Sequence, residues 1–347
     1  MAAAAPIRVG FIGAGANTRS RHIPGFQAID GVDLAVVANR SAASSQEVAD
    51  AFGIPRIAPD WRAVVEDPEV DAVCIGTWPY LHAEATIAAL EAGKHVLCEA
   101  RMAMNLEEAE RMAAAAEKRP DQVAQLVPAP FSFNVDAGIR RFIDEGALGQ
   151  LRELRLEHIT GSLADADAPF SWRQDVTLSG INVLTLGIFH EQTLRWLSDN
   201  PERVLADAAI HTRERTDPES GETQTVAMPD SLSVLGRFPG GARLIYHFSA
   251  VEAGANTVTI RISGSEGTLT VEPSADRLVF HPVQGEAREV AIPAKEKRGW
   301  QVEADFINSI REKKPVTLTA FADGLRYMRF TQAVHDSWQA AGAWKLV

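Results

Sequence analysis

The stretch Gly10-Phe11-Ile12-Gly13-Ala14-Gly15-Ala16-Asn17-Thr18 decides the fold of the first third of this chain. It follows an apolar run at residues 7–12 and opens a helical pattern, the context that a glycine-rich phosphate-binding turn requires. Gly13 permits a tight turn, and Gly15 lets the backbone approach a pyrophosphate at the N-terminus of the next helix. We therefore predict that Gly13, Ala14, Gly15, Ala16, Asn17 and Thr18 bind a dinucleotide, although Thr18 replaces the usual third Gly or Ala.

Strand and helix patterns alternate around this turn. Apolar runs predict strands at residues 7–12, 32–38, 71–75 and 95–98, and amphipathic patterns predict helices at 21–29, 44–52, 81–92 and 106–118. Strands that alternate with helices at this spacing form right-handed βαβ units and a parallel sheet. The sequence thus predicts an α/β Rossmann domain over residues 1–126.

The second predicted strand ends at Asn39-Arg40-Ser41, where an NAD enzyme usually has Asp or Glu to hold the ribose 2′-hydroxyl. Asn39 carries no charge to repel a 2′-phosphate, Arg40 can pair with that phosphate, and Ser41 can donate a hydrogen bond. We therefore expect NADP, with NAD possible, and count all three residues as cofactor-binding. The alternative is that Arg40 is a solvated loop residue.

Composition limits the class of protein. The chain has 347 residues and a formal charge of −12, which argues against nucleic acid or an anionic membrane as a partner. No apolar run is long enough to span a membrane, and residues 1–6 lack the basic start of a signal peptide. With only Cys74 and Cys98 and no zinc-ligand spacing, we expect a cytoplasmic protein without a metal site.

The pattern changes after residue 126. Apolar and polar residues alternate at 151–159, 231–238, 243–249, 257–263, 267–272 and 278–282, which predicts half-buried strands. Residues 300–312 and 320–341 are helical in pattern. We predict an α+β domain over residues 127–347, with an open, mainly antiparallel sheet that serves substrate binding and oligomerisation.

Several segments resemble the Gfo/Idh/MocA oxidoreductases, the family of glucose–fructose oxidoreductase and inositol dehydrogenase. They are the glycine turn, His22-Ile23-Pro24-Gly25, residues 73–82, residues 89–99 and Ile143-Asp144-Glu145-Gly146-Ala147-Leu148-Gly149. The resemblance implies that Thr77 and Trp78 line the dinucleotide, that His82 opens the next helix, and that Glu99 lies near the nicotinamide ribose. Thr77 as a helix cap and His82 as a satisfied helix residue are the alternatives. The resemblance also implies a homodimer or homotetramer formed through the open sheet.

The sequence departs from this family at the residues that move protons. The family follows Glu99 with lysine and proline, whereas this chain has Ala100 and Arg101. Arginine stays protonated, so Arg101 can hold an anion or oxyanion but is a poor proton shuttle.

A second departure lies in residues 180–191, which resemble the family's active-site helix. Its usual aspartate and histidine align with Thr185 and Phe189, and a slip of one residue would recruit His190 instead. On a helix Asn182, Thr185 and Phe189 would share a face. His190 suits acid/base work near neutrality, and a core histidine is the alternative.

Upstream, Trp172 offers a flat face for a sugar or ring, and Arg173 offers a fork for hydroxyl or carboxylate oxygens. We expect an NAD(P)-dependent oxidoreductase that moves a hydride between the nicotinamide and a carbon of a small sugar, cyclitol or polyol. Arg101, Thr185 and His190 are the candidate catalytic residues, and Asn182, Trp172 and Arg173 the candidate substrate residues. Two alternatives remain: a lyase or hydrolase that retains NAD, and a non-catalytic dinucleotide sensor.

Overall fold

The computed structural model describes residues 5–347, so the first four residues of the region considered for a signal peptide lie outside it. The described residues divide into two compact units. The N-terminal unit runs up to Pro128 and includes Gln301–Leu325, and the C-terminal unit contains Ala129–Trp300 and Arg326–Val347. Residues 301–325 therefore pack with the N-terminal unit, whereas the sequence pattern alone groups them with the second domain. Among residues 5–347 no helix is long and apolar enough to cross a membrane.

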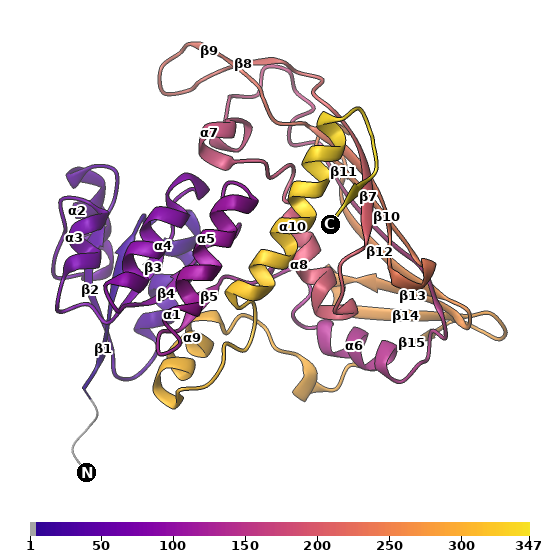
Figure 1. The fold of residues 1–347 in the computed structure, drawn as a ribbon, viewed down its shortest axis with the longest axis horizontal. Coiled ribbons are helices and arrows are strands. Elements are labelled where there is room, and N and C mark those ends of the chain that lie inside the picture. Colours follow the sequence, from indigo (N-terminus) through magenta and orange to yellow (C-terminus); the bar gives the residue numbers. More distant parts are fainter. Residues whose placement is uncertain (1–4) are drawn as a thin grey trace. The chain divides into compact units, whose positions relative to one another are not determined.

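The N-terminal unit is built on a parallel sheet (Figure 1). Its strands are β1 (Ile7–Ile12), β2 (Val32–Ala38), β3 (Ala72–Ile75), β4 (His95–Cys98) and β5 (Ala124–Leu126). They lie in the order β2-β1-β3-β4-β5, so the chain reverses direction along the sheet at β1. Ligands of open α/β sheets bind at such a reversal, beyond the carboxyl ends of the strands. The predicted Rossmann fold is confirmed.

Helices surround this sheet. They are η1 (Thr18–His22), α1 (Ile23–Gln27), α2 (Ala42–Phe52), α3 (Trp61–Glu66), η2 (Pro79–Leu81), α4 (His82–Glu91), α5 (Leu106–Glu117), α9 (Val302–Glu312) and the start of α10 (Phe321–Gln339). Side chains cap several of them, as where Ser41 accepts a hydrogen bond from the Ser44 N–H at the start of α2. Phe26 of α1 packs edge-on against Phe306 of α9, with ring centroids 6.3 Å apart, so α9 completes the core of this unit.

The C-terminal unit is built on a mixed, mainly antiparallel sheet. Its strands run in the order β15-β14-β13-β12-β6-β11-β10-β7-β16, and β8 pairs separately with β9. In chain order the bounds are β6 (Leu151–Thr160), β7 (Arg203–Ala209), β8 (Glu214–Thr216), β9 (Thr223–Thr225), β10 (Ser231–Arg237), β11 (Arg243–Ser249), β12 (Asn256–Gly264), β13 (Gly267–Glu272), β14 (Arg277–Pro282), β15 (Arg288–Glu289) and β16 (Lys345–Leu346). Strands β6 and β11 are parallel.

The longer helices of this unit cover one face of that sheet. The helical segments of the unit are α6 (Asp136–Asp144), η3 (Trp172–Gln174), α7 (Val176–Ser179), α8 (Leu186–Leu197), η4 (Pro239–Gly241), η5 (Pro273–Ala275), η6 (Ala294–Glu296) and α10 from Arg326 onward. Figure 1 shows α6, α8 and α10 on the same side of the strands. Leu154 and Leu156 of β6 point to this side and are fully buried, whereas Arg155 between them is only half-buried. The predicted open sheet with helices on one face is confirmed.

Candidate functional site

The turn after β1 has the geometry of a phosphate-binding loop. Gly13 has a φ of 77°, and a Cβ there would lie 2.9 Å from the Thr77 backbone nitrogen, so this position accepts only glycine. A Cβ on Gly15 would meet only the Gly76 carbonyl oxygen at 3.5 Å, an ordinary contact. Gly13 is therefore required by the fold, whereas the space at Gly15 is open to a ligand.

The helix after this turn begins at Ala16 and Asn17 and continues through η1 and α1. Its first backbone N–H groups provide an anion-binding helix N-terminus. Thr18 is buried against Gly76, where any Cβ would collide with the Thr18 hydroxyl. Because Gly76 has no side chain, there is room for Thr18, which replaces the usual third Gly or Ala of the motif.

A cavity of about 410 Å³ adjoins the turn. It is lined by seven of the predicted cofactor residues: Gly13, Ala14, Gly15, Asn39, Arg40, Thr77 and Trp78. Cavities of a few hundred Å³ are typical of small-ligand sites. The glycine turn and the loop after β2, both predicted to bind the cofactor, therefore line the same cavity.

Arg40 and Trp78 meet at the side of this cavity that adjoins β2. The Arg40 guanidinium lies 5.0 Å from the centre of the Trp78 ring, a cation–π distance. Asn39 fixes the turn, because its Oδ1 accepts from the Ala14 N–H at 2.7 Å and its Nδ2 donates to the Ser44 carbonyl at 3.0 Å. Asn39 is therefore engaged by the protein, and Arg40 is the cationic group that lines the cavity.

Thr77 supplies a direct indication that a ligand is expected here. Its hydroxyl oxygen is buried and has no hydrogen-bond partner among the described residues. Buried hydroxyl groups without partners are costly, and a polar ligand in the cavity would satisfy this one. The turn, the cavity and this hydroxyl together fit a dinucleotide.

Glu99 follows β4, on the other side of β1 from Arg40. Its Oε1 lies 2.9 Å from Nε2 of His22 and also accepts a hydrogen bond from the Asn17 amide. Its Oε2 accepts from the Ala100 N–H at 3.2 Å. In a Rossmann domain the pyrophosphate lies at the turn after β1 and the adenosine at the end of β2, so a dinucleotide bound in that way would have its nicotinamide half at the ends of β3 and β4.

His82 links two loops of this unit. Its ring nitrogens lie 2.8 Å from the Arg101 carbonyl oxygen and 3.0 Å from the Thr77 carbonyl oxygen, and the side chain is fully buried. Burial lowers the pKa of His82 below its ordinary value. A neutral imidazole has one N–H, so His82 donates to one of these two carbonyls. This geometry favours a helix histidine packed between the Thr77 and Arg101 loops. The Arg101 side chain is itself only 3% exposed.

The segment before α8 corrects a prediction. We expected Asn182, Thr185 and Phe189 on one face of a helix, but the helix begins only at Leu186. Leu184 and Thr185 have φ values of 43° and 63°, so the chain turns there and Thr185 is the N-cap residue. Asn182 is buried in the preceding turn, and a Cβ on Gly187 would lie 3.3 Å from its Oδ1.

His190 lies in the core of the C-terminal unit. Its Nε2 lies 2.8 Å from Asn200 Oδ1, its Nδ1 lies 3.2 Å from the Tyr246 hydroxyl, and its ring stacks on Phe330. Burial lowers the pKa of His190 to about 3. A fully buried, neutral and hydrogen-bonded imidazole is a structural group, so the structure favours the core alternative over a proton carrier.

Phe189, where the family resemblance places a histidine, belongs to an aromatic cluster. Its ring stacks on Phe131 with centroids 4.8 Å apart and contacts Phe248 at 5.5 Å. His158 of β6 also contacts Phe189, with ring centroids 4.8 Å apart. His158 is half-buried and shares the helix-covered face of the sheet with Leu156. An imidazole therefore lies beside Phe189, although it comes from a strand.

Trp172 and Arg173 stack on one another. The Arg173 guanidinium lies 4.3 Å from the centre of the Trp172 ring. Ser171 and Gln174 form a reciprocal capping box that fixes this short helical turn. The pair is thus held in one local arrangement in the C-terminal unit.

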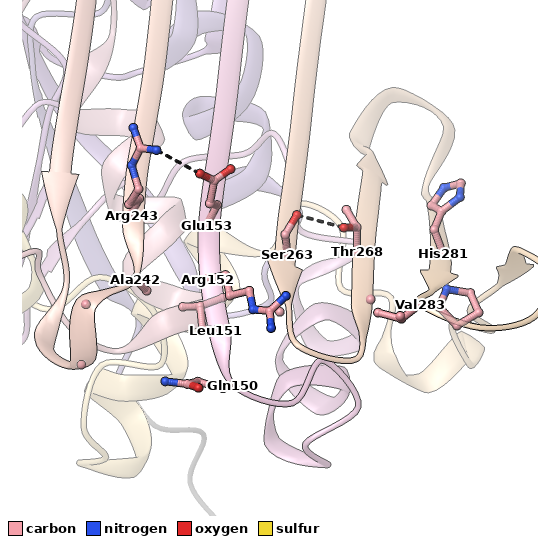
Figure 2. A pocket seen from close by; sticks show the side chains of 15 residues that line it. Gln150, Leu151, Arg152, Glu153, Ala242, Arg243, Ser263, Thr268, His281 and Val283 are labelled. Atoms are coloured by element: carbon pink, nitrogen blue, oxygen red, sulfur yellow. Dashed lines mark hydrogen bonds and ion pairs between the residues drawn. The ribbon is translucent and has the colours of Figure 1, made fainter.

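A second cavity, of about 790 Å³, lies on the open face of the C-terminal sheet (Figure 2). Figure 2 shows Arg243 of β11 paired with Glu153 of β6, with Nη1 and Oε1 3.3 Å apart, and His281 on β14 at the other side. None of the predicted site residues lines it. In the part of the chain that the structure describes, no group of three or more His, Cys, Asp or Glu could hold a metal.

Two groups that lie near the predicted cofactor residues were not predicted from the sequence. Asp60, the N-cap of α3, lines the same cavity as Arg40. Glu303 of α9 lies 2.5 Å from His22 Nδ1, although 281 residues separate them. The only local sign was His22 in a segment that resembles the family, and nothing in the sequence around Glu303 indicated a site.

Sequence profiles match most of the chain. The profile described as "Oxidoreductase family, NAD-binding Rossmann fold" matches residues 7–126. The profile of the GFO/IDH/MocA C-terminal domain matches residues 137–270.

Curated relatives and solved structures are similar over much of the chain. Levoglucosan dehydrogenase of Pseudarthrobacter phenanthrenivorans is 28% identical over 67% of this chain, and the match spans 63% of that protein. Trans-1,2-dihydrobenzene-1,2-diol dehydrogenase of Bos taurus is 29% identical over 75% of this chain and 72% of its own length. A solved levoglucosan dehydrogenase in complex with NADH and L-sorbose has a TM-score of 0.86 at 26% identity, with 98% of each chain covered.

Proposed function

The chain belongs to the Gfo/Idh/MocA oxidoreductase family, and we propose that it transfers a hydride between a nicotinamide dinucleotide and a ring carbon that bears a hydroxyl group. As a member of that family it is an NAD(P)-dependent oxidoreductase. The proposed substrate is a small sugar, cyclitol or related polyol. The observation that carries this proposal is the cavity beside the glycine turn, with the unpartnered Thr77 hydroxyl in its wall.

The names of two relatives narrow the substrate class. Levoglucosan is an anhydro sugar, and the other relative acts on a trans-1,2-diol of a six-membered ring. Both compounds carry secondary hydroxyl groups on a ring. In the C-terminal unit, Trp172 offers a flat apolar surface for such a ring, and Arg173 offers charged donors for its oxygens. Arg101 of the N-terminal unit is proposed separately as a residue that holds a substrate oxygen. Thr185 and Asn182 are further polar residues that we propose for the substrate.

NADP is the proposed cofactor. Arg40 lines the cavity at the end of β2 and can pair with a 2′-phosphate, because a guanidinium matches phosphate geometry. Asp60 lines the same cavity and favours NAD instead, since its carboxylate would repel that phosphate. Arg40 is positioned over Trp78, whereas Asp60 accepts hydrogen bonds from the N–H groups of Arg62 and Ala63.

The nicotinamide supplies the hydride chemistry, and the protein must move one proton to or from the substrate oxygen. Ala100 cannot carry it, Arg101 remains protonated, and His190 is sealed in the core. His158 is the titratable group beside Phe189, and burial lowers its pKa, so the neutral ring can accept a proton at pH 7. We take His158 as the proton carrier.

The test is an oxidation screen followed by absorbance of the reduced nicotinamide at 340 nm. Levoglucosan, myo-inositol and trans-cyclohexane-1,2-diol represent ring hydroxyls, and 1,2-propanediol is the acyclic control. Each is offered with NAD⁺ and NADP⁺ between pH 6 and 9. Turnover of a ring substrate but not of the control is expected, and no reduction with any of them would overturn the proposal.

The alternative function is a lyase or hydrolase, and it is favoured by Thr185 and Phe189, which stand where the resemblance places the family's aspartate and histidine. A lyase or hydrolase that oxidises its substrate only transiently would retain one dinucleotide per chain and show no net absorbance change. Mass spectrometry of the denatured protein for bound NAD(P), with product analysis of the same reactions, distinguishes this outcome. Bound cofactor with product but without net reduction would favour the lyase or hydrolase.

The open sheet face is the proposed contact between copies of this chain. Leu205, Leu235 and Ile245 lie opposite one another on β7, β10 and β11 and form an apolar row on that face. Leu235 is 37% exposed. Light scattering should show a dimer or tetramer that Leu235→Glu dissociates and Ile57→Glu, on the N-terminal unit, leaves intact. A monomeric wild type would contradict this proposal.

A further inference from the structure

A chain of three charged side chains runs behind the nicotinamide half of the N-terminal unit. Glu303 Oε1 lies 2.5 Å from His22 Nδ1, and His22 Nε2 lies 2.9 Å from Glu99 Oε1. His22 is 0% and Glu303 is 3% exposed, whereas the Glu99 side chain retains 15% exposure. Glu99 is therefore the member that can meet a ligand, and the other two lie behind it.

The fold makes specific room for this arrangement. A Cβ on Gly25 of α1 would lie 2.7 Å from Cδ of Glu303, so glycine is what lets the carboxylate approach His22. Glu303 stands in the first turn of α9, where the helix dipole favours a negative charge. Gly25 and the acidic first turn of α9 therefore together allow Glu303 to contact His22.

The charge states follow from the contacts. Burial by itself lowers the pKa of His22, but the hydrogen bonds to Glu303 and Glu99 outweigh it and raise that pKa to about 9. Burial alone would raise the pKa of Glu99, but His22 and Asn17 lower it below its usual value. Near pH 7 His22 is thus a cation between two carboxylates, and the cluster carries a net charge of −1.

Other titratable groups around the cluster stay neutral at that pH. Burial raises the pKa of the Cys74 thiol on β3, and burial lowers the pKa of His82 on α4. Asn17, on the same helical segment as His22, carries no charge. Arg101, two residues after Glu99, adds a constant positive charge that does not titrate in this pH range. Among the groups of the cluster, the charge is therefore set by Glu99, His22 and Glu303.

We propose that Glu303 is a positioning residue that holds His22 as a cation, and that the resulting Glu303–His22–Glu99 cluster keeps a constant net negative charge which favours the oxidised, cationic nicotinamide over the reduced one. This inference rests on the proposed binding of a dinucleotide. The end of β4 lies on the opposite side of the β1 turn from Arg40, which puts Glu99 in the nicotinamide half. Only the ring charge differs between the two redox forms, so a fixed negative charge distinguishes them.

The experiment measures the ratio of the Kd values for NADP⁺ and NADPH from pH 6 to 8, by NADPH fluorescence and competition. Both forms carry the same 2′-phosphate, so its titration cancels in the ratio. In the wild type the ratio should stay flat, because His22 keeps its proton. In Glu303→Gln the His22 cation leaves the cluster neutral at pH 6, and the ratio should rise by on the order of tenfold.

In Glu303→Gln the ratio should then return towards the wild-type value as pH rises, because His22 has lost one carboxylate and releases its proton earlier. Gly25→Ala displaces the Glu303 carboxylate and should also raise the ratio at pH 6. It replaces Glu303→Gln in the test if that variant fails to fold. Glu303→Asp keeps the charge and should restore a flat profile. Glu312→Gln removes an exposed charge from the far end of α9 and should change nothing.

The possible failures are separable. A wild type that binds neither redox form of NADP or NAD would overturn the dinucleotide function together with this inference. A wild type that binds both, with Glu303→Gln and Gly25→Ala showing the same flat ratio, would overturn the role of Glu303 alone. A loss of affinity equal for both redox forms would mean that Glu303 only supports the fold.

Discussion

The imidazole of His158 packs against the phenyl ring of Phe189, with ring centroids 4.8 Å apart, on the helix-covered face of the C-terminal sheet. Phe189 occupies the position that the family resemblance assigns to a histidine. This contact puts an imidazole next to that position and is the basis of the role proposed for His158. His190, the adjacent residue in the chain, is held by Asn200 and Tyr246 instead.

The proton-carrier role of His158 gives the first prediction. General acid/base groups contribute about 10²- to 10⁴-fold to rate, so His158→Gln should lower kcat at least about a hundredfold. Substrate KM should change little, since the variant keeps a polar side chain of similar size. His190→Gln is the matched control and should retain kcat within about threefold once folded protein is compared. Equal losses of kcat in both variants would contradict the assignment of His158, rather than His190, as the proton carrier.

The second prediction concerns Gly15. A Cβ here would make only an ordinary contact, so Gly15→Asp should fold, yet its carboxylate would face the pyrophosphate. We expect the Kd for NADPH to rise more than about a hundredfold in Gly15→Asp and much less in Gly15→Ala. Thermal unfolding should show both variants near the wild type, which separates lost binding from lost structure. Unchanged affinity in Gly15→Asp would contradict the site assignment.

Arg40 tests the choice of cofactor. Removing a guanidinium that pairs with a phosphate costs a charge-assisted interaction, so Arg40→Ala should raise the Kd for NADPH about tenfold or more. The Kd for NADH should rise less than about threefold, through loss of the contact with Trp78. Asp60→Asn removes the carboxylate that would repel the 2′-phosphate, so it should lower the Kd for NADPH relative to the Kd for NADH. Parallel losses for both cofactors in Arg40→Ala would leave no case for a 2′-phosphate site.

Features carried by short segments were predictable, and those made by distant segments were not. Gly13 and Gly15 reveal the phosphate turn because the motif is local and its mechanism requires glycine. The start of α8 was misjudged because the apolar pattern of residues 180–191 suits a helix, whereas Leu184 and Thr185 adopt positive φ. Glu303 contacts His22 only because α9 packs on α1, and a hydrophobic periodicity in the sequence does not predict a contact between such distant residues.

The last prediction concerns acid stability and follows from His190. Burial holds the pKa of His190 at about 3 in the folded protein, against about 6.5 for an exposed imidazole. As pH falls below 6.5 the unfolded chain therefore binds a proton that the folded chain refuses. The free energy of unfolding then decreases by roughly 1.4 kcal/mol per pH unit from this group alone.

Glutamine at position 190 does not titrate and can still donate to Asn200. In His190→Gln the decrease in unfolding free energy between pH 6.5 and 4 should be shallower than in the wild type by about that amount. Urea unfolding curves followed by tryptophan fluorescence at several pH values measure the two slopes, and comparing slopes cancels any constant loss of stability in the variant. Parallel slopes would mean that His190 is protonated in the folded protein, which would reopen its role as a proton carrier.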